Sequence, residues 1–235
     1  MIQADTRAAI APLLSSKPAD ALASYFALEH DPKRTRLVLR RDAEGRALAF
    51  VAVCQTGMDL FRPLAVLRGD DSAALQDALR EALAPGRQYL FSAPAIARPD
   101  LESVVQLHGA GVQEIYALHN ADFKPVVNVL VQTSRTPDGQ WRASIRARDG
   151  SAAAEAGTSW ISSRYAEVFA HVAEAMRGRG LGKSVVSAVS AQVLTLQRTP
   201  LYVTAPDNAA SRRLALRLGY RDTGGRELSG SCSRK

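Results

Sequence analysis

A glycine-rich segment, Arg177-Gly-Arg-Gly-Leu-Gly-Lys-Ser184, separates a strand-like apolar run from a long helix-like stripe of apolar residues. Glycines leave backbone N–H groups uncovered, and the N-terminus of a helix carries partial positive charge. Three basic side chains within the same eight residues add full charges. The segment therefore predicts an anion-binding turn between a strand and a helix.

Two common phosphate-binding motifs do not fit this segment. A P-loop needs a glycine five residues before Gly182, where Arg177 stands. A dinucleotide fingerprint that begins at Gly178 meets Lys183 where its third glycine should be. The pattern Arg/Gln-x-x-Gly-x-Gly/Ala does fit, through Arg177, Gly180 and Gly182. A glycine-rich turn without a ligand is the alternative.

Hydrophobic periodicity predicts an α+β chain with two similar halves. In the first half we expect helix 6–30 broken by prolines, strands 36–40 and 47–54 as a hairpin, strand 64–67, helix 72–83, strand 88–91, helix 100–108 and strand 112–118. In the second half we expect strands 127–132, 141–147, 151–162 and 165–172, helix 181–197, strand 201–204 and helix 208–218, followed by a strand and a frayed tail. The shared order suggests an old duplication, with domains at 1–125 and 126–235; coincidence is the alternative.

Cysteine usage, hydropathy and charge favour a cytoplasmic protein. Cys54 and Cys232 are far apart and match neither a disulfide framework nor zinc-ligand spacing, so we expect no metal. The longest apolar run, 47–54, is far shorter than the roughly 20 residues of a membrane span, and no signal peptide precedes it. The net charge of +7 suits an anionic partner, but the arginines lack interleaved aromatic residues, which argues against nucleic acid.

The stretch from Gly157 to about Thr223 resembles the GNAT N-acetyltransferase superfamily, and within it the glycine N-acyltransferase-like branch. Separate blocks in the right order carry the resemblance: Gly157-Thr-Ser-Trp160, Ala166-Glu-Val-Phe-Ala-His-Val172, the glycine turn, Pro200-Leu-Tyr-Val203, Asn208-Ala-Ala-Ser-Arg-Arg-Leu214 and Leu218-Gly-Tyr220. It implies a mixed α/β fold with a splayed mixed sheet flanked by helices, preceded by a degenerate GNAT-like first half. Coenzyme A would enter between the fourth and fifth strands.

The resemblance also implies an activity and a cofactor. An acetyl or other short acyl group would pass from acetyl-CoA, or another short acyl-CoA, to the primary amine of a small molecule or amino acid. N–H groups of residues 179–183 would hold the pyrophosphate, Val172 would pair with pantetheine, and Asn208, which also suits an ordinary N-cap, would reach the cofactor arm. The residues expected to bind the cofactor are Ala170, Val172, Arg177, Arg179, Gly180, Leu181, Gly182, Lys183, Asn208 and Ser211.

A base is needed because an amine nucleophile is protonated near pH 7. Glu167 lies on the strand where the family often places a carboxylate base, and His171 shares its side of that strand. Either side chain could act directly or through water. The alternatives are that Glu167 pairs with an arginine such as Arg164 and that His171 is a hydrogen-bonded core histidine.

The general acid is less clear from the sequence. Many relatives carry a tyrosine directly after the leucine that corresponds to Leu214, but this chain has Ala215. Tyr202, which we take as the catalytic candidate, Tyr220 or solvent could replace it. The absence of the usual tyrosine should slow catalysis rather than abolish it, because a thiolate whose thiol has a pKa of about 8.5 is a tolerable leaving group.

Three functions therefore stay open. Direct acyl transfer in a ternary complex leads, since neither cysteine lies near the motif. Ala215 motivates a non-catalytic coenzyme A-binding regulator, and the near P-loop motivates a nucleotide phosphohydrolase. The sequence determines neither the acceptor nor the acyl chain length, and it leaves open whether the chain forms a homodimer.

The first half is expected to have lost its cofactor site. Its counterpart of the glycine turn, Leu67-Arg-Gly-Asp-Asp-Ser72, carries two aspartates that would repel a pyrophosphate but suit a helix N-terminus. The apolar segment around Tyr25 and Phe26 suggests that this half covers the acceptor side of the pocket or is structural.

Overall fold

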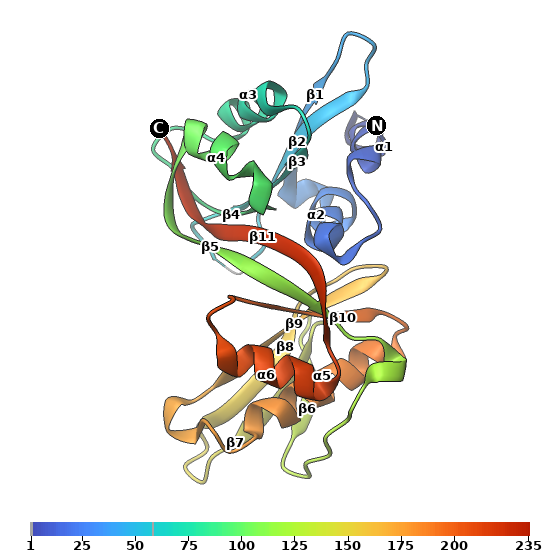
Figure 1. The fold of residues 1–235 in the computed structure, drawn as a ribbon, viewed down its shortest axis with the longest axis vertical. Coiled ribbons are helices and arrows are strands. Elements are labelled where there is room, and N and C mark those ends of the chain that lie inside the picture. Colours follow the sequence, from blue (N-terminus) through green and yellow to red (C-terminus); the bar gives the residue numbers. More distant parts are fainter. Residues whose placement is uncertain (1, 58) are drawn as a thin grey trace. The chain divides into compact units, whose positions relative to one another are not determined.

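The computed structural model describes residues 2–57 and 59–235 (Figure 1). Its contacts divide the chain into two compact units. The first is built from the chain up to Gln113 together with Arg226–Lys235, and the second is Glu114–Gly225. Among the described residues, no helix is long and apolar enough to cross a bilayer.

The first unit is a mixed sheet with helices. Its strands have the order β1-β2-β3-β4-β11-β5, with β3 and β4 parallel and the pairs β1–β2, β2–β3 and β4–β11 antiparallel. The helices are α1 (Ile2–Ile10), α2 (Ala21–Ser24), α3 (Ser72–Ala82) and α4 (Arg98–Val104). The strands are β1 (Thr35–Arg41), β2 (Ala47–Cys54), β3 (Leu64–Gly69), β4 (Gln88–Pro94), β5 (Val105–Ala117) and β11 (Arg221–Arg234).

The sequence features of this unit explain its local structure. The helical segment expected over 6–30 is broken by 3-10 turns at Ala11–Leu13 and Pro18–Asp20, each of which contains a proline without an N–H to donate. Asp71 is the N-cap of α3, and its carboxylate accepts a hydrogen bond from the Ala74 N–H. The core lies between α3, α4 and the sheet, where Leu79, Phe91 and other apolar side chains are buried.

The second unit continues as a mostly antiparallel sheet with one parallel pair. Its strand order is β11-β5-β10-β9-β8-β7-β6, in which β9 and β10 run parallel and the pairs β5–β10, β6–β7, β7–β8 and β8–β9 run antiparallel. Helix α5 packs across β7, β8 and β9, and α6 packs beside α5 (Figure 1). The elements are β6 (Gln132–Arg135), β7 (Trp141–Arg146), β8 (Ala152–Ile161), β9 (Tyr165–Val172), α5 (Leu181–Thr195), β10 (Thr199–Thr204) and α6 (Ala209–Leu218).

Two long strands belong to both units. The C-terminal part of β11 pairs with β4 from Glu227–Pro94 to Ser233–Gln88 in the first unit. In the second unit, the hydroxyl of Thr223, near the start of β11, donates to the carbonyl of Ile115 on β5. The last ten residues therefore complete a unit whose other residues all precede position 114. Contacts thus divide the chain at 113/114 and 225/226, whereas the sequence analysis divided it once, at 125/126.

The frayed tail expected at the C-terminus is wrong. Residues up to Arg234 are in β11, and Leu228 and Cys232 are fully buried. The Ser- and Gly-rich composition has a packing reason instead, because a Cβ on Gly230 would lie 2.8 Å from the Ala110 Cα. Small residues let β11 and β5 approach closely. In the sequence, a strand made of such residues has the same composition as a loop.

Two other expected elements differ from the structure. Helix α4 ends at Val104, so residues 105–108, expected to be helical, begin β5. The strand expected at 127–132 is a loop up to position 131, and β6 begins at Gln132. The side chains of Val127 and Val129 are almost fully exposed there, so their apolar alternation does not report burial. The remaining expected elements are present with shifts of a few residues.

Candidate active site

Strands β9 and β10 form a wedge. They pair in parallel from Tyr165–Thr199 to Val168–Tyr202, and no register pair follows. Residues 169–172 of β9 therefore diverge from β10 and leave backbone groups on the facing edges without a strand partner. Backbone groups of this kind are available to a ligand that can donate and accept hydrogen bonds. We call the end of the wedge at Val168 and Tyr202 its apex.

The glycine turn lies at the open end of the wedge. Gly178 and Gly180 have φ angles of +79° and +78°, which favour glycine. A Cβ on either residue would meet no atom within 4 Å, so both residues border open space. Gly180 is the N-cap of α5, and no side chain caps this helix. Gly180 itself has no side chain that could accept from the first N–H groups of α5, which suits an anion-binding turn.

Gly182 brings α5 close to the wedge. A Cβ on this residue would lie 3.0 Å from Val172 Cγ2 and 3.2 Å from Leu214 Cδ1. Those distances are shorter than ordinary van der Waals contacts, so a larger residue would push α5 away from β9 and α6. The glycine therefore sets the position of the helix N-terminus relative to both neighbours.

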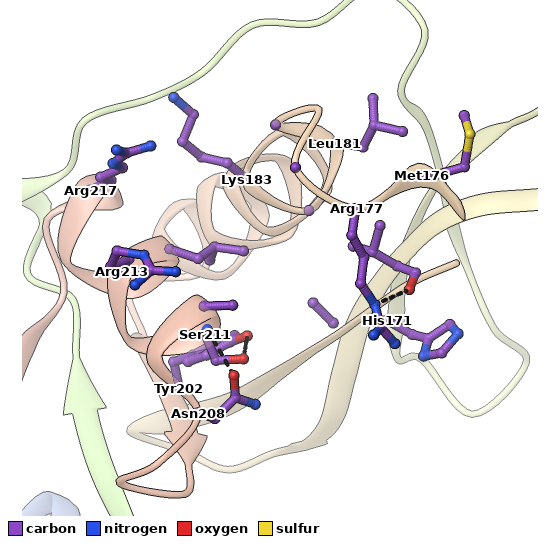
Figure 2. A pocket seen from close by; sticks show the side chains of 17 residues that line it. His171, Met176, Arg177, Leu181, Lys183, Tyr202, Asn208, Ser211, Arg213 and Arg217 are labelled. Atoms are coloured by element: carbon purple, nitrogen blue, oxygen red, sulfur yellow. Dashed lines mark hydrogen bonds between the residues drawn. The ribbon is translucent and has the colours of Figure 1, made fainter. Parts of the chain in front are cut away.

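A cavity of about 580 Å³ lies between β9, β10, α5 and α6 (Figure 2). Most of the residues predicted for the site line it, namely Ala170, His171, Val172, Arg177, Gly180, Leu181, Gly182, Lys183, Tyr202, Asn208 and Ser211. Arg179 and Glu167 do not line it. The structure thus brings together four blocks that are separated by up to about 40 residues in the sequence.

Asn208 and Tyr202 meet at Ser211. Asn208 is the N-cap of α6, and its Oδ1 accepts a hydrogen bond from the Ser211 N–H at 3.1 Å, as its capping role predicts. The Tyr202 hydroxyl lies 3.5 Å from Ser211 Oγ. Burial raises the pKa of Tyr202, although the hydrogen bond with Ser211 lowers it in part. The phenol is therefore protonated at neutral pH and can donate a proton.

Tyr220 is not available to the cavity. Its hydroxyl is hydrogen-bonded to Ser190 Oγ at 2.7 Å, its side chain is buried, and it does not line the cavity. Its ring packs edge-on against Tyr202, with 5.9 Å between the ring centroids. Burial raises its pKa as well. Tyr220 thus supports Tyr202 in position and does not replace it.

Glu167 lies at the apex on the other face of the sheet. Val168 and Tyr202 belong to the core beneath α5, so side-chain alternation places Glu167 on the opposite face. The Trp160 indole Nε1–H donates to Glu167 Oε2 at 3.1 Å. His171, four residues further along β9, is exposed and lines the cavity, so it is not a core histidine.

Several cavity residues were missed by the sequence analysis, namely Met176, Gly178, Ala210, Arg213, Leu214 and Arg217. Four of them follow the spacing i, i+3, i+4, i+7 along α6, which could have indicated that they share the helix face of the cavity. Met176 lies in a 3-10 turn, and no sequence pattern marks it.

A second wedge in the first unit is filled by an ion network. Strands β3 and β4 also pair over only three residues and stop at Val66–Ser92. The Arg68 guanidinium is buried there and contacts Asp20 at 2.8 Å and Glu227 at 3.2 Å. Three aspartates line the adjacent cavity of about 370 Å³, namely Asp20, Asp70 and Asp100. This charge is unfavourable for a diphosphate.

The comparisons with known proteins agree with this architecture. Residues 148–228 match the family model described as FR47-like protein. Among solved structures, a GCN5-related N-acetyltransferase from Kribbella flavida has a TM-score of 0.63 at 16% identity over 94% of this chain and 96% of that chain. A search of curated proteins found no match.

Two further structures extend over nearly the whole chain. A tandem GNAT protein from the clavulanic acid biosynthesis pathway has a TM-score of 0.56 at 15% identity, covering 98% of this chain and 93% of that chain. An acetyltransferase of the GNAT family from Colwellia psychrerythraea has a TM-score of 0.56 at 12% identity, covering 98% and 94%. These likenesses confirm the expected fold, including its arrangement in two halves. The chain therefore has the GNAT fold, in two units, and its FR47-like segment contains the wedge and the glycine turn.

Proposed function

We propose that the chain transfers an acyl group from coenzyme A to a primary amine of a small molecule. The observation that carries this proposal is the wedge after Val168–Tyr202, which opens onto the uncapped N-terminus of α5. The GNAT fold and the FR47-like match support it. An amino acid is the acceptor class that the glycine N-acyltransferase-like resemblance implies.

The residues present fit an acyl-CoA. Backbone N–H groups at the start of α5 suit a diphosphate, and Arg177 and Lys183 add positive charge beside them. The diverging edges of β9 and β10 offer backbone partners to the two amides of a pantetheine arm. Acyl-CoA supplies the activated thioester carbonyl, and the apex would be the position of that carbonyl.

Glu167 and Tyr202 would act as general base and general acid from opposite faces of the sheet. Glu167 would accept the proton that the amine loses as it attacks the thioester carbon, directly or through water. Tyr202 would donate its phenolic proton to the sulfur as the carbon–sulfur bond breaks. Since Cys54 and Cys232 are buried in the first unit, transfer would be direct, in a ternary complex. His171 lies about 13 Å along the strand from Glu167, nearer the open end.

Calorimetric titration with acetyl-CoA tests the proposal. We expect saturable binding with one site per chain, and release of free thiol when a panel of amino acids, polyamines and aminoglycosides is supplied. Absence of heat at millimolar acetyl-CoA would contradict cofactor binding. Binding without turnover across the panel would instead favour a coenzyme A-binding protein without catalysis, and ATP with magnesium is the control for a phosphohydrolase.

Conservative variants separate the proton-transfer roles. We expect Glu167→Gln to lower kcat at least about 100-fold, because a positioned base contributes about that much or more. Tyr202→Phe should lower kcat about tenfold, since a thiolate leaves without full protonation. His171→Gln should stay within about threefold of the wild type. The measurement is kcat and KM for acetyl-CoA over about pH 6 to 10, a range that spans the pKa of about 8.5 of the thiol that the reaction releases.

Tyr220→Phe is the matched control for Tyr202→Phe. It removes a hydroxyl from the neighbouring ring, which is buried and bonded to Ser190, so it should lower stability by about 1 kcal/mol and leave kcat unchanged. Equal losses of kcat in the two tyrosine variants would assign the effect to packing. An unchanged acidic limb of the pH profile in Glu167→Gln would exclude Glu167 as the base.

A further inference from the structure

The cavity has more positive charge than a diphosphate needs. Four basic side chains line it, namely Arg177, Lys183, Arg213 and Arg217. In the described parts of the chain, none of the four has a carboxylate within 4.0 Å. The diphosphate of a coenzyme A carries about two negative charges near neutral pH. About two positive charges are therefore left for a further anionic group.

The surplus charge lies on α6. Arg213 and Arg217 are exposed and four residues apart, and like charges at this spacing destabilise a helix. Their neighbour Arg212 differs, because its Nε lies 3.1 Å from a Glu114 carboxylate oxygen. Arg217 is in the last turn, where the helix dipole favours a cation, but Arg213 is in the middle of α6 and has no such compensation.

The four cations form two groups around the N-terminus of α5. Figure 2 shows Lys183, Arg213 and Arg217 together on the α6 side of the helix, and Arg177 beside β9 on the other side. Arg177 Nε also lies 3.4 Å from the Val172 carbonyl oxygen, which holds it near the wedge. The α6 group thus lies apart from Arg177 and the β9 edge of the wedge.

We propose that Arg213 and Arg217 on α6 bind the 3′-phosphate on the ribose of coenzyme A. This inference rests on the proposed function and adds a selectivity to it. A phosphomonoester is close to a dianion at pH 7, and arginine binds phosphate oxygens through two parallel N–H donors. The protein would therefore select 3′-phosphorylated acyl-CoA over the dephospho form of the same molecule.

Calorimetric titration with coenzyme A and with 3′-dephospho-coenzyme A tests this selectivity. We expect the wild type to prefer coenzyme A by at least about tenfold, because charge-assisted hydrogen bonds to a phosphate are strong. The double variant Arg213→Gln/Arg217→Gln should bind coenzyme A and its dephospho form within about threefold of each other, through weaker binding of coenzyme A alone. Its thermal unfolding should occur at or slightly above the wild-type temperature, since both side chains are exposed and a like-charge pair is removed.

The matched control is Arg146→Gln/Arg148→Gln. It removes two exposed arginines from the same unit, outside the cavity lining, and should keep the wild-type preference. Equal affinities of the wild type for the two ligands would overturn the inference and leave acyl transfer standing. An equal loss of both affinities in the α6 variant would also overturn it, because the two arginines would then act on groups that both ligands share. If the wild type binds neither ligand, the proposed function fails and the inference fails with it.

Discussion

Replacing Gly178 and Gly180 together by alanine is expected to lower the affinity for acetyl-CoA at least about 100-fold, which corresponds to about 2.7 kcal/mol. Both residues have positive φ angles near +79°, a conformation that costs an L-residue roughly 1–2 kcal/mol. The turn can relieve this strain by rotating its N–H groups away from the cavity. If it does not, the new methyl groups occupy the open space that a diphosphate would need. Titration calorimetry measures the loss.

The chain offers a matched control for this variant. Gly139 and Gly150 also have φ angles of +82°, also border open space, and lie in hairpin turns of the same unit, outside the cavity lining. Gly139→Ala/Gly150→Ala should therefore lose a similar free energy of unfolding and keep the wild-type affinity. Equal losses of affinity in the two double variants would mean that strain, and not the turn at the cavity, determines binding.

Replacing Glu227 by alanine is expected to destabilise the first unit by about 3–5 kcal/mol. The variant leaves the guanidinium of Arg68 buried with one carboxylate instead of two, and it removes the acceptor of the Ser92 hydroxyl, which donates to Glu227 at 2.6 Å. Arg68 keeps Asp20 as a partner, but a buried cation that loses one of its two carboxylates and a buried hydroxyl that loses its acceptor each carry a desolvation cost. Chemical unfolding monitored by circular dichroism measures the change.

Glu81→Ala is the control for a salt bridge of similar length. The Arg40–Glu81 pair has an N···O distance of 2.7 Å, but the glutamate side chain is 55% exposed. Solvent screens such a pair, so its loss should cost less than about 1 kcal/mol. A second variant, Asp20→Asn/Arg68→Met/Glu227→Leu, should recover much of the stability because it removes all three charges of the network. Similar losses in the free energy of unfolding for Glu227→Ala and Glu81→Ala would show that the buried network stabilises the unit no more than an exposed salt bridge does.

The elements around the wedge could be predicted because local patterns determine them. Strand β9 was expected at 165–172 and is observed there, since its small and apolar residues alternate with polar ones. The start of α5 follows from the glycine turn, and Asn208 and Gly219 bound α6 as a cap pair. The fold class followed from the order of these blocks, and the comparisons confirm it.

The errors arose where the partner of a segment is distant in sequence. Nothing near Gly230 indicates that its close neighbour is Ala110, so a buried strand looked like a loose tail. The apolar residues Val127 and Val129 alternate as in a strand, but the structure leaves both exposed. Arg213 and Arg217 looked like ordinary surface charges, because the cavity that they line is made by three other elements.

Strand β11, which both units share, also determines when the first unit can be completed during synthesis. Strand β4 emerges from the ribosome more than a hundred residues before the segment of β11 that pairs with it. Until that segment of β11 has been synthesised, one edge of β4 lacks its strand partner and the core lacks the buried side chains of Leu228 and Cys232, and exposed strand edges of this kind promote aggregation. The first unit can therefore be completed only after β11 has been synthesised, and chaperones that cover the edge of β4 should aid its folding until then.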